Sequence, residues 1–77
     1  MEQSLDIFKK QLGQNVSEIR NMLNLNICEF SKQTNISENT IRNIEKGKIL
    51  MRGKTFLRLL FFVKENNIRL SVLFHKL

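Results

Sequence analysis

Apolar residues recur every three or four positions along the first third of the chain. The repeat consists of Leu5, Phe8, Leu12, Val16, Ile19 and Leu23. Because 3.6 residues make one turn of an α-helix, this spacing predicts one apolar stripe on a helix over residues 5–24. Ser4 is expected to cap the helix, with Asp6 in its first turn. Gly13, which two polar residues follow, either kinks this helix or divides it into two.

A second, shorter helix is predicted over residues 27–34. Asn26 is a favourable N-cap, and Glu29 stands at the third helical position, as in a capping box. The side chains expected to face inward are those of Ile27, Phe30 and Thr34. Asn35 then interrupts the pattern, because asparagine tolerates a left-handed backbone better than any residue except glycine.

A third helix is predicted directly afterwards, over residues 38–46. Ser37 is expected to be its N-cap, and Gly47 lies just past its end, where glycine commonly terminates helices. Ile41 and Ile44 are three positions apart and are expected to face the core.

Residues 27–46 therefore have the pattern helix, short turn, helix, which is typical of the helix-turn-helix unit. In that unit the second helix lies in the major groove of DNA. The polar residues on the outward side of the predicted third helix are Glu38, Asn39, Arg42, Asn43 and Lys46. Asparagine pairs with an adenine edge, arginine with a guanine edge, and a carboxylate accepts from a cytosine amino group. The same residues would equally suit an ordinary solvent-exposed helix face.

The last third of the chain is strongly apolar. A fourth helix is predicted over residues 55–65, and residues 59–63 make it apolar almost all round. Asn66 and Asn67 end it, and residues 70–77 form either a short fifth helix or an apolar tail.

These C-terminal segments carry more apolar surface than one 77-residue core can bury. We therefore expect residues 54–77 to provide the surface of a homodimer, since a two-fold dimer needs a self-complementary patch. Phe61 is expected opposite the faces of Leu57 and Leu60, and hence exposed. The residues expected at the dimer interface are Phe61, Leu73, Phe74 and Leu77.

The distribution of charge is more informative than the net charge of +6. Residues 1–25 carry as many acidic as basic side chains, so the whole excess falls in residues 26–77. Within residues 42–58, only Glu45 opposes the cations, which are Arg42, Lys46, Lys48, Arg52, Lys54 and Arg58. Such a stretch attracts a polyanion such as DNA, although charge alone is equally consistent with a solvated face.

The length of 77 residues indicates one domain, and several classes of function have no support in the sequence. A single cysteine, Cys28, provides no internal disulfide and suits a reducing cytoplasm, where we expect the protein to be. No apolar run has the length of a membrane span. We find no paired nucleophile and base, no zinc spacing and no phosphate-binding loop, and His75 has no second histidine. We expect no enzymatic activity, metal, cofactor or small-molecule ligand.

Taken in order, these segments resemble the lambda repressor and Cro-like (Xre-like) helix-turn-helix family from Leu12 to Phe74. The segments that carry the resemblance are Leu12-Gly13, Val16, Ile19-Arg20, Leu25 to Ser31, Asn35 to Ser37, Thr40 to Lys48 and Ile68 to Phe74. The resemblance implies a compact, all-α, five-helix domain in which helices two and three form the helix-turn-helix. It also implies binding to operator DNA as a dimer.

The resemblance further assigns roles to particular residues. It implies base contacts from Glu38, Asn39 and Asn43, with Arg42 nearby. The phosphate contacts that it implies come from Asn26, Lys46, Lys48 and the loop that includes Arg52 and Lys54. It also implies a structural ion pair between Arg20 and Glu45.

The chain departs from the family pattern in four places. Ile27 stands where members commonly have a phosphate-binding glutamine, and Asn35 stands where they have a turn glycine. The fourth helix is longer than usual through residues 64–67, which puts the family's dimer geometry in doubt. Residues 1–11 are extra, and we expect a helical extension that lengthens the first helix or packs at a subunit boundary.

The sequence thus predicts a sequence-specific double-stranded DNA-binding transcriptional regulator, a dimeric repressor that reads a palindromic operator through the major groove. The alternative is a protein-interaction module, such as an antitoxin that binds a toxin or an antirepressor adaptor. RNA binding is disfavoured, because the phenylalanines lie on core stripes and none is predicted to stack on unpaired bases.

Overall fold

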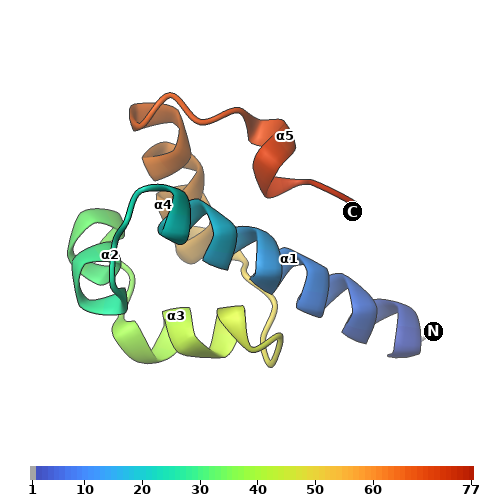
Figure 1. The fold of residues 1–77 in the computed structure, drawn as a ribbon. Coiled ribbons are helices and arrows are strands. Elements are labelled where there is room, and N and C mark those ends of the chain that lie inside the picture. The colour runs from blue at the N-terminus through green and yellow to red at the C-terminus, as the bar shows by residue number, and fades with distance from the viewer. Residues whose placement is uncertain (1) are drawn as a thin grey trace.

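The computed structural model describes the backbone of residues 2–77 and the side chains of residues 4–77. Its first element, α1, spans Glu2–Met22 and continues through Gly13 as one helix, so the possibility that Gly13 divides it into two is wrong (Figure 1). The helix begins before Ser4, so the predicted N-cap is wrong, since no helix-breaking residue precedes it. The expected extension over residues 1–11 is helical from Glu2, and residue 1 lies outside the described residues.

The apolar stripe of α1 is buried only along its second half. Leu12, Val16 and Ile19 lie in the core, whereas Leu5 and Phe8 are 45% and 39% exposed. The first turns of α1 project beyond the other helices (Figure 1). Phe8 borders a hollow together with Phe74 and Leu77 and is only partly covered. The predicted stripe therefore lies on one helix, and its first two residues are only partly buried.

Gly13 allows α1 and α3 to approach closely. A Cβ atom at this position would overlap the carbonyl oxygen of Ile44 and lie 3.1 Å from that of Glu45. Because the obstacle is backbone, no side-chain rotation can relieve such an overlap. The glycine is therefore required by the packing of α1 against α3.

The helix α2 spans Ile27–Thr34, as predicted, and both of its ends match the sequence signals. Asn26 Oδ1 accepts a hydrogen bond from the Glu29 amide at 2.8 Å, and Glu29 Oε1 accepts one from the Asn26 amide at 2.9 Å. This reciprocal pair confirms the capping box. Asn35 follows in the left-handed conformation, with a φ of 61°.

The helix α3 spans Glu38–Glu45, and Lys46 is its C-cap rather than its last helical residue. Gly47 has a φ of 73°, which confirms the expected position of this glycine just past the helix. The amide of Lys48 donates to the Asn43 carbonyl at 2.9 Å, which closes the end of α3 in a Schellman arrangement.

The C-terminal part consists of α4 over Gly53–Glu65 and the four-residue helix α5 over Leu70–Leu73. The helix α4 starts two residues before the predicted boundary. Residues 70–77 thus form a short helix followed by a few exposed residues, which decides between the two possibilities that the sequence left open.

Five helices enclose one core, and the described residues contain no strand. The helix α1 packs against α3 and α5, α2 packs against α3 and α4, and α4 packs against α5. The rings of Phe30 and Phe62 meet edge to face in the core, with centroids 5.2 Å apart. The fold is therefore all-α.

Candidate nucleic-acid interface

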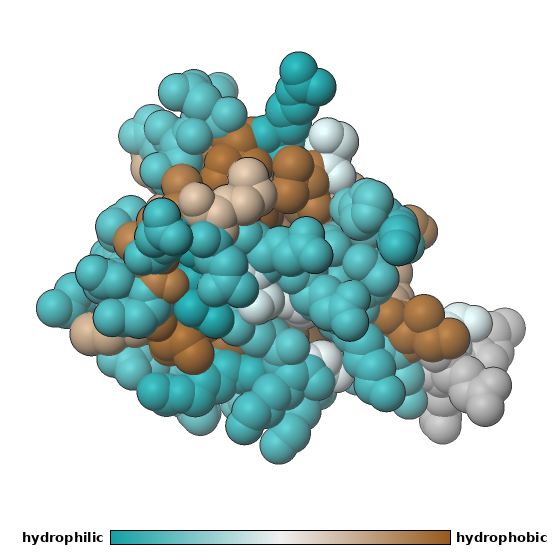
Figure 2. Space-filling model, viewed as in Figure 1, coloured by the Kyte–Doolittle hydropathy of each residue, from teal (hydrophilic) through white to brown (hydrophobic). Residues whose placement is uncertain are grey.

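The exposed side of α3 is a hydrophilic face built on a buried one. Ile41 and Ile44 are buried, as predicted, and they attach the helix to the core. Of the polar residues expected on the other side, Asn39 and Arg42 are exposed, and Glu38 and Asn43 are partly exposed. The edge of the molecule formed by α3 is largely hydrophilic (Figure 2).

Two of these side chains form an ion pair on the surface. Arg42 Nη2 donates to Glu38 Oε1 at 3.0 Å, one helical turn away, and the side chains are 49% and 41% exposed. The pair holds the guanidinium group along the helix face, where its remaining N–H groups are available to a ligand. A donor fork and an acceptor carboxylate therefore lie side by side on this face.

The turn between α2 and α3 is fixed by side-chain hydrogen bonds. Thr34 Oγ1 donates to the Phe30 carbonyl at 2.7 Å and accepts from the Ile36 amide at 3.3 Å. The Ser31 hydroxyl donates to the Ile36 carbonyl. Ile36 itself is buried, so the turn is held both by polar contacts and by the core.

The first turn of α3 and the neighbouring helix α4 add two further contacts. Ser37 Oγ accepts from the Thr40 amide at 3.2 Å, which confirms Ser37 as the N-cap. Arg58, on α4, donates to the Asn35 carbonyl at 3.1 Å. Sequence patterns do not predict this contact, because the two residues are 23 positions apart and Arg58 belongs to the basic stretch.

The opposite end of α3 is fastened to α1. Arg20 donates from Nε and Nη2 to the two carboxylate oxygens of Glu45 at 2.8 and 3.0 Å, and from Nη1 to the Leu25 carbonyl at 2.9 Å. The side chains of Arg20 and Glu45 are only 16% and 12% exposed. The hydrogen bond to Glu45 raises the pKa of Arg20, burial opposes that effect, and attraction by the carboxylate adds to it. The structure thus brings together the two residues expected to form an ion pair.

The basic residues expected to meet phosphates are all exposed, but they lie on different elements. Lys46 and Lys48 follow α3 directly, Arg52 is the N-cap of α4, and Lys54 lies in the first turn of α4. Asn26 is exposed at the start of α2, where its Oδ1 atom is already engaged in the capping box.

Sequence reasoning missed a buried polar residue, Asn15. Its Nδ2 atom donates to the carbonyls of Leu73 and His75, each at 2.8 Å, and its Oδ1 atom accepts from Gln11 at 2.9 Å. These bonds fasten the C-terminal segment to α1. The available signal was a polar residue three positions after Leu12, on the inward side of the predicted stripe.

The residues expected at the dimer interface do not lie together in the structure. Leu73 is fully buried, so its assignment to the interface is wrong: it faces inward from α5 and belongs to the core. Phe74 and Leu77 are each 43% exposed. They border an apolar hollow of about 240 Å³, whose other lining residues are Phe8, Leu12, Leu50, Met51 and Phe56.

Phe61 is exposed, as expected, but it lies elsewhere. It is 66% exposed, and Leu57 is 63% exposed. Residues four positions apart lie on the same face of a helix, so the prediction that Phe61 lies opposite Leu57 is wrong. Both border a separate open hollow of about 570 Å³, together with Gln33, Thr34, Asn35 and Arg58.

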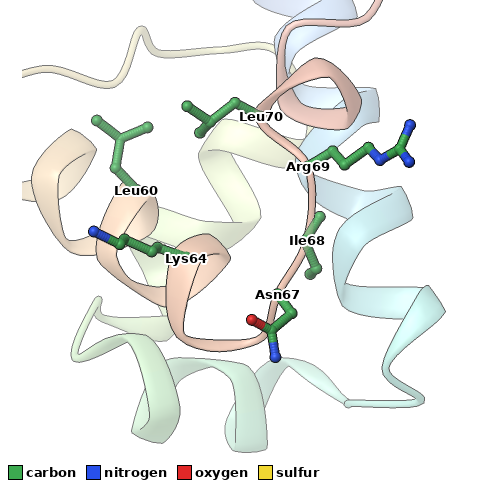
Figure 3. A pocket seen from close by; sticks show the side chains of 6 residues that line it. All are labelled: Leu60, Lys64, Asn67, Ile68, Arg69 and Leu70. Atoms are coloured by element: carbon green, nitrogen blue, oxygen red, sulfur yellow. The ribbon is translucent and has the colours of Figure 1, made fainter.

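A third hollow, of about 440 Å³, lies between the end of α4 and the segment that leads to α5. Leu60 and Leu70 project toward each other on one side of it, and Lys64 projects from α4 beside them (Figure 3). The side chain of Arg69 points the other way (Figure 3).

Among the side chains of residues 4–77, no cluster of three His, Cys, Asp or Glu is placed to hold a metal ion. No helix in this range is both long and apolar enough to cross a membrane. No family model matches the chain, and no match was found among curated proteins or solved structures.

Proposed function

We propose that this protein is a sequence-specific double-stranded DNA-binding transcriptional regulator in which α2 and α3 act as a helix-turn-helix. The observation that carries the proposal is the exposed face of α3, where amide, guanidinium and carboxylate groups stand on a helix fixed at both ends. The resemblance to lambda repressor and Cro-like proteins supports the same function.

In this proposal α3 enters the major groove. Asn39 and Asn43 hydrogen-bond to base edges, and Arg42 pairs with a guanine while Glu38 accepts from an amino group of a neighbouring base. Because α3 is held to α1 through Glu45, its orientation is set before DNA binds. Little free energy is then needed to order the reading face.

The basic residues position this face on the DNA. Lys46, Lys48, Arg52 and Lys54 neutralise phosphates along the backbone, and Asn26 contributes from the start of α2. These contacts carry no sequence information, but they provide a large share of the affinity and make it depend on salt.

We also propose that the protein acts as a homodimer in the cytoplasm and represses transcription from a palindromic operator. One α3 helix covers a few base pairs, so two copies on half-sites one helical turn apart give useful specificity. Phe74 and Leu77, on the rim of the apolar hollow, are the residues that we assign to the dimer contact. Sedimentation of the wild type and of Phe74→Glu tests this assignment. A wild type that is monomeric at tens of micromolar contradicts it.

The test of DNA binding begins with selection from random duplexes of about 30 base pairs, long enough for two half-sites. We expect enrichment of a two-fold symmetric sequence whose affinity falls steeply with salt concentration. Lys48→Ala and Arg52→Ala should each reduce the slope of log affinity against log salt concentration by about one unit. Each should also weaken binding to all DNA sequences alike. Lys64→Ala, the control, removes an equal charge from the far end of α4 and should leave the slope unchanged. Failure to enrich any sequence refutes the proposed function.

A further inference from the structure

The outer face of α4 carries a second apolar stripe besides the one that it buries. Leu59, Phe62 and Val63 face the core, whereas Leu57 and Phe61 are more than three-fifths exposed. We define the outer face of α4 by Leu57, Leu60, Phe61 and Lys64, which are spaced at i, i+3, i+4 and i+7. This spacing places them along one side of the helix, as in an amphipathic helix that packs against another helix.

The surroundings of this face have the shape of a docking site. The hollow of about 570 Å³ lies between Phe61 on α4 and Asn35 at the end of α2. A separate hollow of about 440 Å³ borders the same helix at Leu60 and Lys64 and extends to Leu70 (Figure 3). Exposed apolar surface of this kind is unusual on a small monomeric protein and marks contact with a partner.

The charge of α4 indicates what kind of partner suits this face. The exposed ionisable residues of α4 are Lys54, Arg58, Lys64 and Glu65, three cations against one carboxylate. Among the described residues, no carboxylate lines either hollow. Pairing this face with that of a second copy would bring two net positive helices together, which is unfavourable. An acidic helix would instead place its carboxylates against the cations and its leucines against Phe61.

We propose that the outer face of α4 docks an acidic amphipathic helix of a partner protein. This surface is distinct from the hollow bordered by Phe74, and it lies at the opposite side of α4 from the buried stripe. The interaction does not depend on the proposed DNA binding. Helix-in-groove recognition uses apolar anchors spaced along one face of the bound helix. On α4 the positions i, i+3 and i+4 are the apolar residues Leu57, Leu60 and Phe61, and position i+7 is the cation Lys64.

The test uses two designed helical peptides of about 18 residues, or about five turns. Both have leucine at i, i+3, i+4 and i+7, and the remaining positions are mainly glutamate in one peptide and lysine in the other. We expect calorimetric titration of the full chain to show binding of the acidic peptide with a Kd of roughly 1–100 μM. The basic peptide should bind at least about tenfold more weakly.

Variants locate the binding. Phe61→Ser should leave the melting temperature close to that of the wild type, since the side chain is exposed. It should weaken binding of the acidic peptide about tenfold. Ile7→Ser is the control, because Ile7 on α1 is 67% exposed and lies outside both hollows. It should bind the acidic peptide like the wild type.

Several results would overturn the proposal. They are equal affinity for the two peptides, unchanged binding by Phe61→Ser, and absence of binding up to about 1 mM peptide. If Phe61→Ser instead converts a dimeric wild type into a monomer, a second copy covers this face and the proposal is wrong. None of these measurements involves DNA, so their outcome is separable from that of the proposed function.

Discussion

Replacing Glu45 by glutamine tests how α3 is attached to the rest of the fold. The substitution keeps the size of the side chain and one carbonyl acceptor, but it removes the charge that faces Arg20. Two hydrogen bonds, of 2.8 and 3.0 Å, join these side chains in the native structure. After the substitution a guanidinium group remains in a site that is 16% exposed, without a counter-ion.

The burial of the pair sets the size of the effect. A solvent-exposed ion pair contributes about 0–1 kcal/mol, whereas removing one partner of a buried pair costs about 3–5 kcal/mol. Arg20 cannot easily turn toward water, because it also donates to the Leu25 carbonyl at 2.9 Å. Since glutamine retains one acceptor, we expect Glu45→Gln to lower the free energy of unfolding by about 2 kcal/mol.

The matched control is Glu38→Gln, on the same helix. Glu38 also pairs with an arginine, Arg42, but both side chains are more than 40% exposed. That substitution should therefore cost about 0.5 kcal/mol or less. Urea unfolding at one fixed protein concentration measures both variants. In thermal melts, Glu45→Gln should lower Tm by roughly 8–16 °C.

Two results would refute this reasoning. One is equal stability of the Glu45 and Glu38 variants, which would mean that the buried pair contributes no more than the exposed one. The other is a Glu45→Gln variant that melts like the wild type yet loses discrimination between DNA sequences. In that case Glu45 contacts DNA rather than fastening α3.

The pKa of Arg20 determines how the stabilisation by the Arg20–Glu45 ion pair depends on pH. The hydrogen bond to Glu45 raises the pKa of Arg20, so the stabilisation that Arg20 provides is fully present from neutral pH up to the pKa of Arg20 in the unfolded chain. It is lost only as the pH rises through the folded value, which is strongly alkaline. We therefore expect Arg20 to contribute the same stabilisation at about pH 7 and about pH 9.

Four further substitutions examine other parts of the structure. Gly13→Ala should lower the free energy of unfolding in urea by about 1–3 kcal/mol, because the added Cβ overlaps a backbone carbonyl of α3. This loss is expected despite the better helix propensity of alanine, and a gain in stability would contradict the packing. Asn15→Ala should cost about 1–3 kcal/mol and speed amide hydrogen exchange at the C-terminus, because it orphans two carbonyls; exchange at the wild-type rate would show that these bonds do not hold the segment. Asn39→Ala and Asn43→Ala should each weaken binding to the selected DNA sequence by about 1–3 kcal/mol and should change binding to random DNA little. Equal losses of affinity for both kinds of DNA would exclude base reading.

The short-range features of the fold could be predicted from the sequence. The capping box at Asn26, the left-handed Asn35 and the glycine that ends α3 each depend on residues within a few positions of one another. Their physics is local, so the order of residues is sufficient to identify them. The inward position of Ile41 and Ile44 followed from helical spacing in the same way.

Features that depend on distant parts of the chain could not be predicted with the same success. Helical spacing shows that Leu5 and Phe8 share a side with Leu12, but it does not show how far the other helices extend along α1. Likewise the burial of Leu73 depends on where α5 folds back onto α1, which Asn15 determines through hydrogen bonds across 58 residues of sequence.

The candidate site combines both kinds of feature. Its polar face was identifiable because the outward positions of a helix follow from the inward ones. The orientation of this face could not be predicted, because it depends on contacts made outside the face. Arg20 holds one end of α3 through Glu45, and Arg58 hydrogen-bonds to the turn at the other end. Residues that touch no DNA in our proposal therefore control how the reading face is presented. Changes in α1 or α4 should alter DNA recognition by moving α3, even where every polar side chain on α3 is retained.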